Sequence, residues 1–358
     1  MIEPTHTVSE PRAALRANDT IETGEMAQLH NSISTASDNC PVPPSGLPGA
    51  LHGFISFCLE GGIHLWVQLT GRLVRKSEAS WLAGPLGGRE RIGTEIYERV
   101  AQAEGLVIRT PPNAGLLEHF NLLRGPKFDP DAVHPDIRHF YEHAAEYQLD
   151  VWSEVSLTGR FFLWLLVEFI SRRMDQLNFP ISSLEVAKGM TSEVVQLVDP
   201  VSDRIVNTGW LRRLKSSGRV IYAGLYSATQ LPDEAGPCVK VTFPCRGSAN
   251  VYLTPVAHAD GSFGLVSSGT AFGRTGFYRM IDGGPDHYIV RHVRSLRELF
   301  HVYVDAESVL RTDHTVFFLG LSIIRLHYKM TRVPLDHHSG SHQATQEEQD
   351  LVAVEDIL

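Results

Sequence analysis

The sequence predicts an α+β protein, in which an N-terminal helical region packs on a C-terminal, mostly antiparallel β-sheet that is curled or barrel-like. Apolar residues recur every three or four positions in the first half of the chain. After about residue 193, short β-branched and aromatic runs replace that pattern, with no helix of crossover length between them. Helices followed by strands are typical of α+β folds, and an antiparallel sheet of about eight or nine strands tends to close or fold over.

Composition divides the chain into four regions. Residues 1–48 are rich in Ser, Thr, Asn, Pro and Glu and predict a disordered tail. Residues 49–180 form the helical region and residues 181–333 the antiparallel β region, and we expect these two to fold as one unit. Residues 334–358 predict a second disordered tail, which carries six acidic residues and no Lys or Arg out of a formal net charge of −9.

Helical periodicity is clearest in the 49–180 region. Residues 51–66 and 92–103 place apolar side chains three and four positions apart, and Gly105 is expected to end the second helix. Pro135 suits the first turn of a third helix. The stretch Leu157–Leu177 is intensely apolar and predicts the most buried helix.

In the β region, alternating runs predict strands separated by turn signals such as Asp260-Gly261 and Asp282-Gly283-Gly284. The segment Asn207–Arg213 contains an aromatic and two cations and predicts an edge or a loop. The predicted strands are Val194–Val198, Arg219–Tyr226, Val239–Phe243, Asn250–Val256, Phe263–Ser267, Phe277–Ile281, Ile289–Val293, Phe300–Val304 and one strand within Thr315–Met330.

Charge and hydropathy limit the partners. The chain has 32 Lys and Arg against 41 Asp and Glu, which argues against nucleic-acid binding. The first residues show neither a basic nor an apolar segment of a secretory signal, so we expect a cytoplasmic protein. The apolar stretches 51–69 and 161–170 are interrupted or too short to span a bilayer. Peripheral contact of either stretch with a membrane surface stays open.

The predicted third helix and its exit supply the candidate catalytic residues Tyr141, Glu142, Tyr147 and Asp150. A carboxylate beside aromatic surface can have a raised pKa and act as a general acid or base. A helix that packs its aromatic residues against a sheet accounts for the same residues, and both interpretations stay open.

The sequence predicts neither a metal nor a cofactor. His139, Glu142 and His143 have the H-x-x-E-H order of inverted zinc metallopeptidases, but no third ligand stands out, and a solvated helix face is the better explanation of the pattern. The glycine-rich segment Gly269–Gly276 links two predicted strands. It therefore lacks the following helix that dinucleotide and phosphate loops require.

The β region supplies the candidate ligand-binding residues. Residues four apart on a strand share a face, and a cation between apolar neighbours needs an anionic partner if it points inward. The arginines at 291, 294 and 297 predict a solvated loop or short helix, and their planar guanidinium groups could also grip a carboxylate or phosphate. The candidates are Arg212, Tyr222, Tyr226, Lys240, Arg294 and His327.

Three functions follow from these patterns. The first is binding of an apolar or amphipathic small molecule in a β-barrel-like cavity covered by helices. The alternative is a cofactor-independent enzyme, such as a cyclase, isomerase or hydrolase, on the same scaffold. The third is an interaction protein that docks through its acidic tails and the amphipathic segment Leu51–Trp66 on a partner or a membrane.

Overall fold

The computed structural model describes residues 49–87, 95–156 and 189–333, and they form a mostly antiparallel β-sheet with few helices. Both predicted tails and the predicted helix Leu157–Leu177 lie outside the described residues. The helices are α2 (Gly49–Thr70), α3 (Ile96–Glu104) and α4 (Pro135–Glu142). The strands are β1 (Arg72–Arg75), β2 (Val107–Arg109), β3 (Tyr147–Val155), β4 (Met190–Val198), β5 (Ile205–Leu214), β6 (Val220–Thr229), β7 (Cys238–Cys245), β8 (Gly247–Ala257), β9 (Phe263–Val266), β10 (Gly276–Asp282), β11 (His287–Val293), β12 (Leu296–Val304), β13 (Leu310–Phe318) and β14 (Leu321–Arg332).

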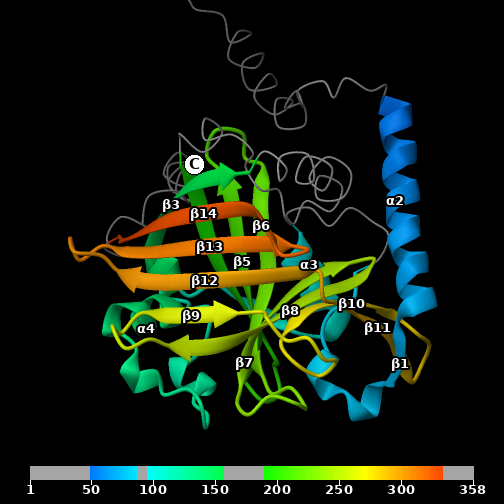
Figure 1. Cartoon of the computed structure of the whole chain (residues 1–358), viewed down its shortest axis with the longest axis horizontal. Coiled ribbons are helices and arrows are strands. Elements are labelled where there is room, and N and C mark those ends of the chain that lie inside the picture. Colours follow the sequence, from blue (N-terminus) through cyan, green and yellow to red (C-terminus); the bar gives the residue numbers. More distant parts are fainter. Residues whose placement is uncertain (1–48, 88–94, 157–188, 334–358) are drawn as a thin grey trace, which may run out of the picture. The chain divides into compact units, whose positions relative to one another are not determined.

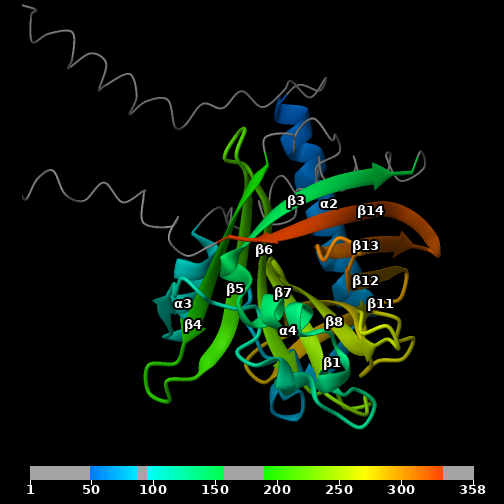
Figure 2. The same cartoon turned by 90° about the vertical axis from the view of Figure 1, so that its left-hand side faces the viewer.

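The strands join in one sheet with a branch at β8. The main order is β2-β4-β5-β6-β7-β8-β9-β12-β13-β14-β3, and β10, β11 and β1 continue from β8 on a second path. Figures 1 and 2 show β12–β14 crossing β5 and β6 at a steep angle, so the sheet folds over on itself. Among the described residues no strand pair joins the two ends of the main path, and the sheet is therefore curled but not closed.

The inner face of the curled sheet packs against α4. Ile137, Phe140 and Tyr141 are spaced three and four apart and are buried on one side of α4, with Pro135 in its first turn as expected. The ring of Tyr141 meets Phe263 of β9 edge to face, with 5.3 Å between ring centroids. Close aromatic packing of this kind fixes α4 inside the bend of the sheet.

The outer face of the sheet carries two smaller cores. On β4–β6, α3 buries Tyr97 directly over Gly209, where a Cβ would lie 2.5 Å from the ring, so only glycine fits there. Gly105 ends α3 in a left-handed conformation with φ 68°, as the sequence predicts. On β8 and β10, Trp81 packs edge to face on Tyr252 and Tyr278. Both faces of the central strands are therefore covered.

Three local predictions are corrected by the structure. The predicted helical region also contains the strands β1, β2 and β3. The segment Asn207–Arg213 is neither an edge nor a loop, because it lies in β5, between β4 and β6, and is buried on both faces. The single strand expected within Thr315–Met330 is a hairpin of β13 and β14, joined by Leu319 and Gly320 at φ 51° and 84°.

Candidate functional site

On the inner face, three of the predicted ligand-binding residues come together around Arg212. Its side chain is 6% exposed, and its guanidinium carbon lies 3.9 Å from the ring centroid of Trp210 and 4.4 Å from that of Tyr222. A third ring, Tyr328 of β14, lies at 5.3 Å. Within the described part of the chain, Arg212 forms no ion pair, and its Nε has no hydrogen-bond partner. Aromatic faces thus hold this buried cation without an anion.

The two tyrosines predicted with Arg212 bond to each other. The hydroxyls of Tyr222 and Tyr226 lie 2.6 Å apart. Burial raises the pKa of Tyr222 well above its usual value and that of Tyr226 to about 12, so both stay protonated at neutral pH. Nearby, Nε2 of His314 lies 3.4 Å from a carboxylate oxygen of Glu298. Among the described residues, the inner face therefore brings together an unpaired cation, a pair of neutral hydroxyls and a His–carboxylate pair.

The predicted catalytic residues have separate structural settings. Tyr141 is buried in the aromatic core beside α4, and burial raises the pKa of its phenol. A carboxylate oxygen of Glu142 accepts a hydrogen bond of 2.6 Å from the backbone N–H of Phe120. The hydroxyl of Tyr147 lies 3.0 Å from Nδ1 of His139, and Asp150 lies on the opposite face of β3 from Tyr147. Tyr141 and Tyr147 thus share one buried core, whereas the carboxylate of Glu142 bonds to the backbone and Asp150 lies on the other face of β3.

The H-x-x-E-H segment does not assemble a metal centre in the described residues. The rings of His139 and His143 lie 4.5 Å apart, and Nδ1 of His143 is 3.1 Å from the carbonyl oxygen of Asn113. No group of three His, Cys, Asp or Glu side chains within the described ranges is placed to hold a metal ion.

Two more predicted ligand residues lie away from the inner cluster. Lys240 is buried on the outer face, where its ammonium donates hydrogen bonds to the carbonyl oxygens of Trp81 and Ala83. Burial lowers its pKa to about 8. His327 lies on the outer face of β14, with Nδ1 2.7 Å from a carboxylate oxygen of Asp313. Both side chains thus have protein partners.

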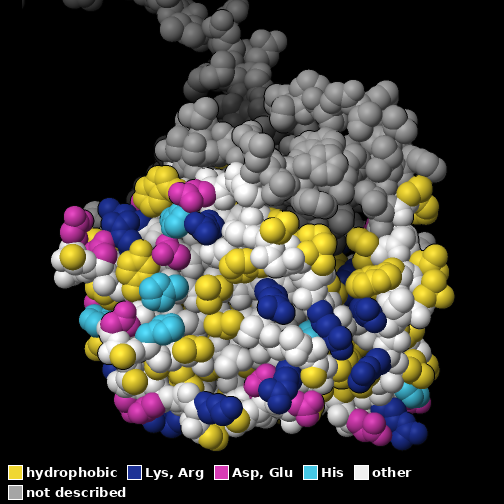
Figure 3. Space-filling view, in the orientation of Figure 1, with side chains coloured by type: hydrophobic (Ala, Val, Ile, Leu, Met, Phe, Trp, Pro, Cys, Tyr) yellow, Lys and Arg dark blue, Asp and Glu magenta, His cyan; other side chains and the backbone are white. Residues whose placement is uncertain are grey.

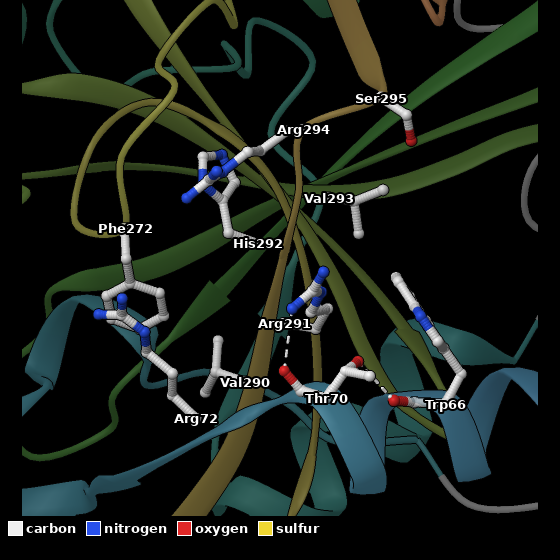
Figure 4. Close-up of a pocket in the computed structure, with 10 residues that line it drawn as sticks. All are labelled: Trp66, Thr70, Arg72, Phe272, Val290, Arg291, His292, Val293, Arg294 and Ser295. Carbon is white, nitrogen blue, oxygen red and sulfur yellow. Dashed lines mark hydrogen bonds between the residues drawn. The ribbon is translucent and has the colours of Figure 1, made fainter.

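Arg294 lines a pocket of about 350 Å³ between the end of α2 and the neighbouring strand β11 (Figure 4). This volume falls within the range of small-molecule sites. Arg294 itself follows β11 and opens the turn to β12. The arginine series predicted as a loop or short helix is instead divided between β11 (Arg291), the turn (Arg294) and β12 (Arg297). The lining residues are Trp66, Thr70, Arg72, Phe272, Val290, Arg291, His292, Val293, Arg294 and Ser295.

A tight helix-to-strand connection builds this pocket. Gly71 follows α2, and a Cβ there would lie 2.5 Å from the carbonyl oxygen of Val67 and 2.7 Å from a methyl carbon of Ile289. Glycine thus lets α2 end directly against β11. The β1 strand pairs with β11 only as far as Arg72 opposite Val290, so the pocket opens where β11 runs past the end of β1. Residues far apart in sequence are brought together by this pairing.

The pocket is cationic. Its lining includes Arg72, Arg291 and Arg294 and no Asp or Glu. Nη1 of Arg291 donates a 3.0 Å hydrogen bond to the carbonyl oxygen of Thr70, and its guanidinium carbon lies 5.4 Å from the ring of Trp66. None of the three arginines forms an ion pair with a carboxylate of the described residues. Three guanidinium groups without a counter-charge favour an anion in this pocket.

His292 adds a neutral polar group to the same pocket. Its ring stacks on Tyr278 with centroids 4.5 Å apart, and both ring nitrogens are buried without a hydrogen-bond partner. Burial, together with the charges of Arg294 and Arg291, lowers its pKa to about 4. At neutral pH the imidazole is thus uncharged and keeps one N–H to donate. Unsatisfied buried nitrogens in a pocket are typical of groups that meet a ligand or water.

Comparison with known proteins gives one distant similarity. The chain is 23% identical over 253 residues to the "Uncharacterized membrane protein YndJ" of Bacillus subtilis (strain 168). The alignment covers 69% of this chain and 42% of that protein, so the chain spans less than half of its length. No family model matches the chain, and no solved structure matches it either. In the described ranges, no helix combines the length and apolar character needed to cross a membrane.

Sequence reasoning identified Arg294 and Arg291 but missed the rest of the pocket. Trp66 and Arg72 belong to the end of α2 and to β1, more than 200 positions before β11. His292 stands between Arg291 and Val293 on β11, on the opposite face of the strand from both, which was a usable signal for a buried histidine close to cations. On the inner face, Trp210 and Tyr328 were missed as partners of Arg212, because nothing local joins β5 to β14.

Proposed function

We propose that this protein binds an amphipathic small molecule whose anionic head group sits in the pocket between α2 and β11. The observation that carries the proposal is the lining of that pocket, with three arginines and no carboxylate. Arginine offers a planar, doubly donating fork that fits phosphate and carboxylate oxygens. The sequence analysis expected such an amphipathic ligand inside the curled sheet, whereas we propose that it binds in this outer pocket.

The apolar part of the lining supports an amphipathic rather than a purely ionic ligand. Trp66, Phe272, Val290 and Val293 line the same space as the arginines. Small-molecule sites are typically apolar with a few placed polar groups, which here are cationic. The similar protein of Bacillus subtilis is named as a membrane protein, which favours lipids as the source of such ligands. A cytoplasmic location stays a prediction, and so does the enzymatic alternative.

Calorimetric titration with octyl phosphate tests the proposal. We expect saturable binding to the full chain, and none with octyl trimethylammonium, which has the same tail and the opposite charge. Replacing two exposed pocket arginines, Arg72→Gln with Arg294→Gln, should weaken binding about a hundredfold, because each removes a charge-assisted hydrogen bond. Arg297→Gln is the matched control, since Arg297 is exposed on β12 outside the pocket. Equal binding by all three proteins would refute the proposal.

A further inference from the structure

The outer side of α2 is exposed and apolar. Leu65 and Leu69 are 54% and 75% exposed, and Cys58 lies exposed seven positions before Leu65. Residues four and seven apart share a helix face. Val67, two positions from each leucine, points the other way and is completely buried. The helix thus presents apolar side chains to both the protein and the solvent near its C-terminal end.

This apolar face continues into the cationic pocket. Trp66 is partly exposed on α2 and also lines the pocket, and Leu73 on β1 is exposed beside Arg72. Figure 3 shows Lys and Arg side chains gathered beside hydrophobic ones at the lower right, where Figure 1 places α2 next to β10 and β11. Exposed apolar side chains grouped next to cations are typical of surfaces that meet lipid.

We propose that the exposed face of α2, defined by Cys58, Leu65, Trp66 and Leu69, docks on a bilayer that contains anionic phospholipids, with a phosphate head group in the adjacent pocket. This inference rests on the proposed function, because it takes the ligand of the pocket to be part of a membrane. The helix lies along the interface, where its leucines enter the acyl boundary and the arginines face the head groups.

Charge decides between a bilayer and a second copy of the chain. If two copies of the chain associated through α2, each helix face would need an apolar or complementary surface on the other copy. In a symmetric contact, the arginines beside α2 would instead face the same arginines of the second copy. Arg72, Arg291 and Arg294 have no carboxylate with them in the pocket. An anionic lipid surface matches both the leucines and these cations.

Vesicle sedimentation tests the docking surface. We expect the full chain to sediment with vesicles of phosphatidylcholine and phosphatidylglycerol, and to stay in solution with phosphatidylcholine alone. Leu65→Ser with Leu69→Ser should lower vesicle binding more than tenfold and leave octyl phosphate binding unchanged. Val201→Ser with Leu122→Ser is the matched control, since both residues are exposed and neither belongs to β10 or β11, the strands that α2 contacts. Arg72→Gln with Arg294→Gln should lower vesicle binding about fivefold per arginine and weaken octyl phosphate binding by the same hundredfold as above.

The outcomes separate the two proposals. If the serine variant on α2 binds vesicles as well as the unchanged chain does, the docking surface is wrong while the pocket stands. If the variant Arg72→Gln with Arg294→Gln binds octyl phosphate as well as the unchanged chain does, the pocket proposal is wrong. If the unchanged chain is a dimer that does not bind vesicles, and the serine variant is a monomer, this face binds a second copy of the chain instead.

A fluorophore on Cys58 gives an independent readout. In a Cys40→Ser background, its fluorescence should increase only with the anionic vesicles, since Cys238 and Cys245 are buried.

Discussion

Two regions of this protein hold arginine without a carboxylate, and they differ in what surrounds the charge. On the inner face, Arg212 is buried and packed between the rings of Trp210 and Tyr222. In the α2–β11 pocket, Arg72 and Arg294 are exposed and share a cavity. A buried cation loses hydration that aromatic faces replace only in part, whereas an exposed one keeps its water until an anion displaces it. The first arrangement costs folding free energy, and the second is available for binding.

The largest expected effect separates these two roles directly. Arg212→Met should raise the free energy of unfolding by about 2 kcal/mol, because an apolar side chain of similar length replaces a buried charge that has no anion. Octyl phosphate binding should not change. The exposed counterpart, Arg294→Met, should leave stability within about 0.5 kcal/mol and weaken binding. Urea unfolding and calorimetry measure both, and a strong loss of stability in Arg212→Met would show that this cation has a favourable partner.

The pocket histidine gives a pH-dependent test. In the unfolded chain an imidazole takes up its proton near pH 6.5, whereas the pKa of His292 in the folded protein is about 4. Between these values the unfolded state binds more protons, so stability falls as the pH falls. His292→Phe keeps the stack on Tyr278 and should remove up to about 2 kcal/mol of the loss measured by urea unfolding between pH 7 and pH 5. An identical loss in both proteins would contradict the depressed pKa.

A smaller effect concerns the inner hydroxyl pair. Tyr222→Phe removes the 2.6 Å hydrogen bond to Tyr226 and leaves that hydroxyl without this partner. We expect the free energy of unfolding to fall by about 1 kcal/mol. Tyr303→Phe is the control, since its hydroxyl forms no hydrogen bond among the described residues. Equal stability of the two variants would mean that water replaces the bond between Tyr222 and Tyr226.

The smallest effect is that of salt. Added salt should weaken octyl phosphate binding several-fold, because charges exposed in an open pocket are screened. The stability gained by Arg212→Met should persist at the same salt concentration, since a buried charge is screened much less. An affinity for octyl phosphate that does not change with salt concentration would indicate that the octyl chain alone supplies the binding free energy.

The sequence predicted most strands but missed β1, β2 and β3 within the predicted helical region, and it missed β5, which breaks the alternation rule. The segment Asn207–Arg213 has polar residues on both faces of β5, and both faces are buried, so no inside-outside pattern is visible. The β13–β14 hairpin was read as one strand because its turn uses Leu319 in a left-handed conformation instead of the usual Asn-Gly. Helix ends marked by Gly105 and Pro135 were predictable because glycine and proline act locally.

The candidate site was predictable only in part, for a related reason. Arg291 and Arg294 lie three positions apart in sequence, so their shared ability to bind an anion could be predicted. Their cavity depends on Gly71, which brings α2 against β11 across more than 200 residues. Likewise, the aromatic cage of Arg212 joins β5, β6 and β14. Contacts of this kind are set by strand order, which a single sequence does not specify.

The most direct test of the pocket is to measure the pKa of His292. NMR titration of its imidazole protons, with and without octyl phosphate, gives this pKa. A bound anion compensates the charges of Arg291 and Arg294, which help to lower this pKa to about 4. We therefore predict that octyl phosphate raises the pKa of His292 toward its ordinary value, and that Arg72→Gln with Arg294→Gln requires far more ligand for the same change. A titration curve of His292 that is identical with and without saturating ligand would contradict anion binding in this pocket.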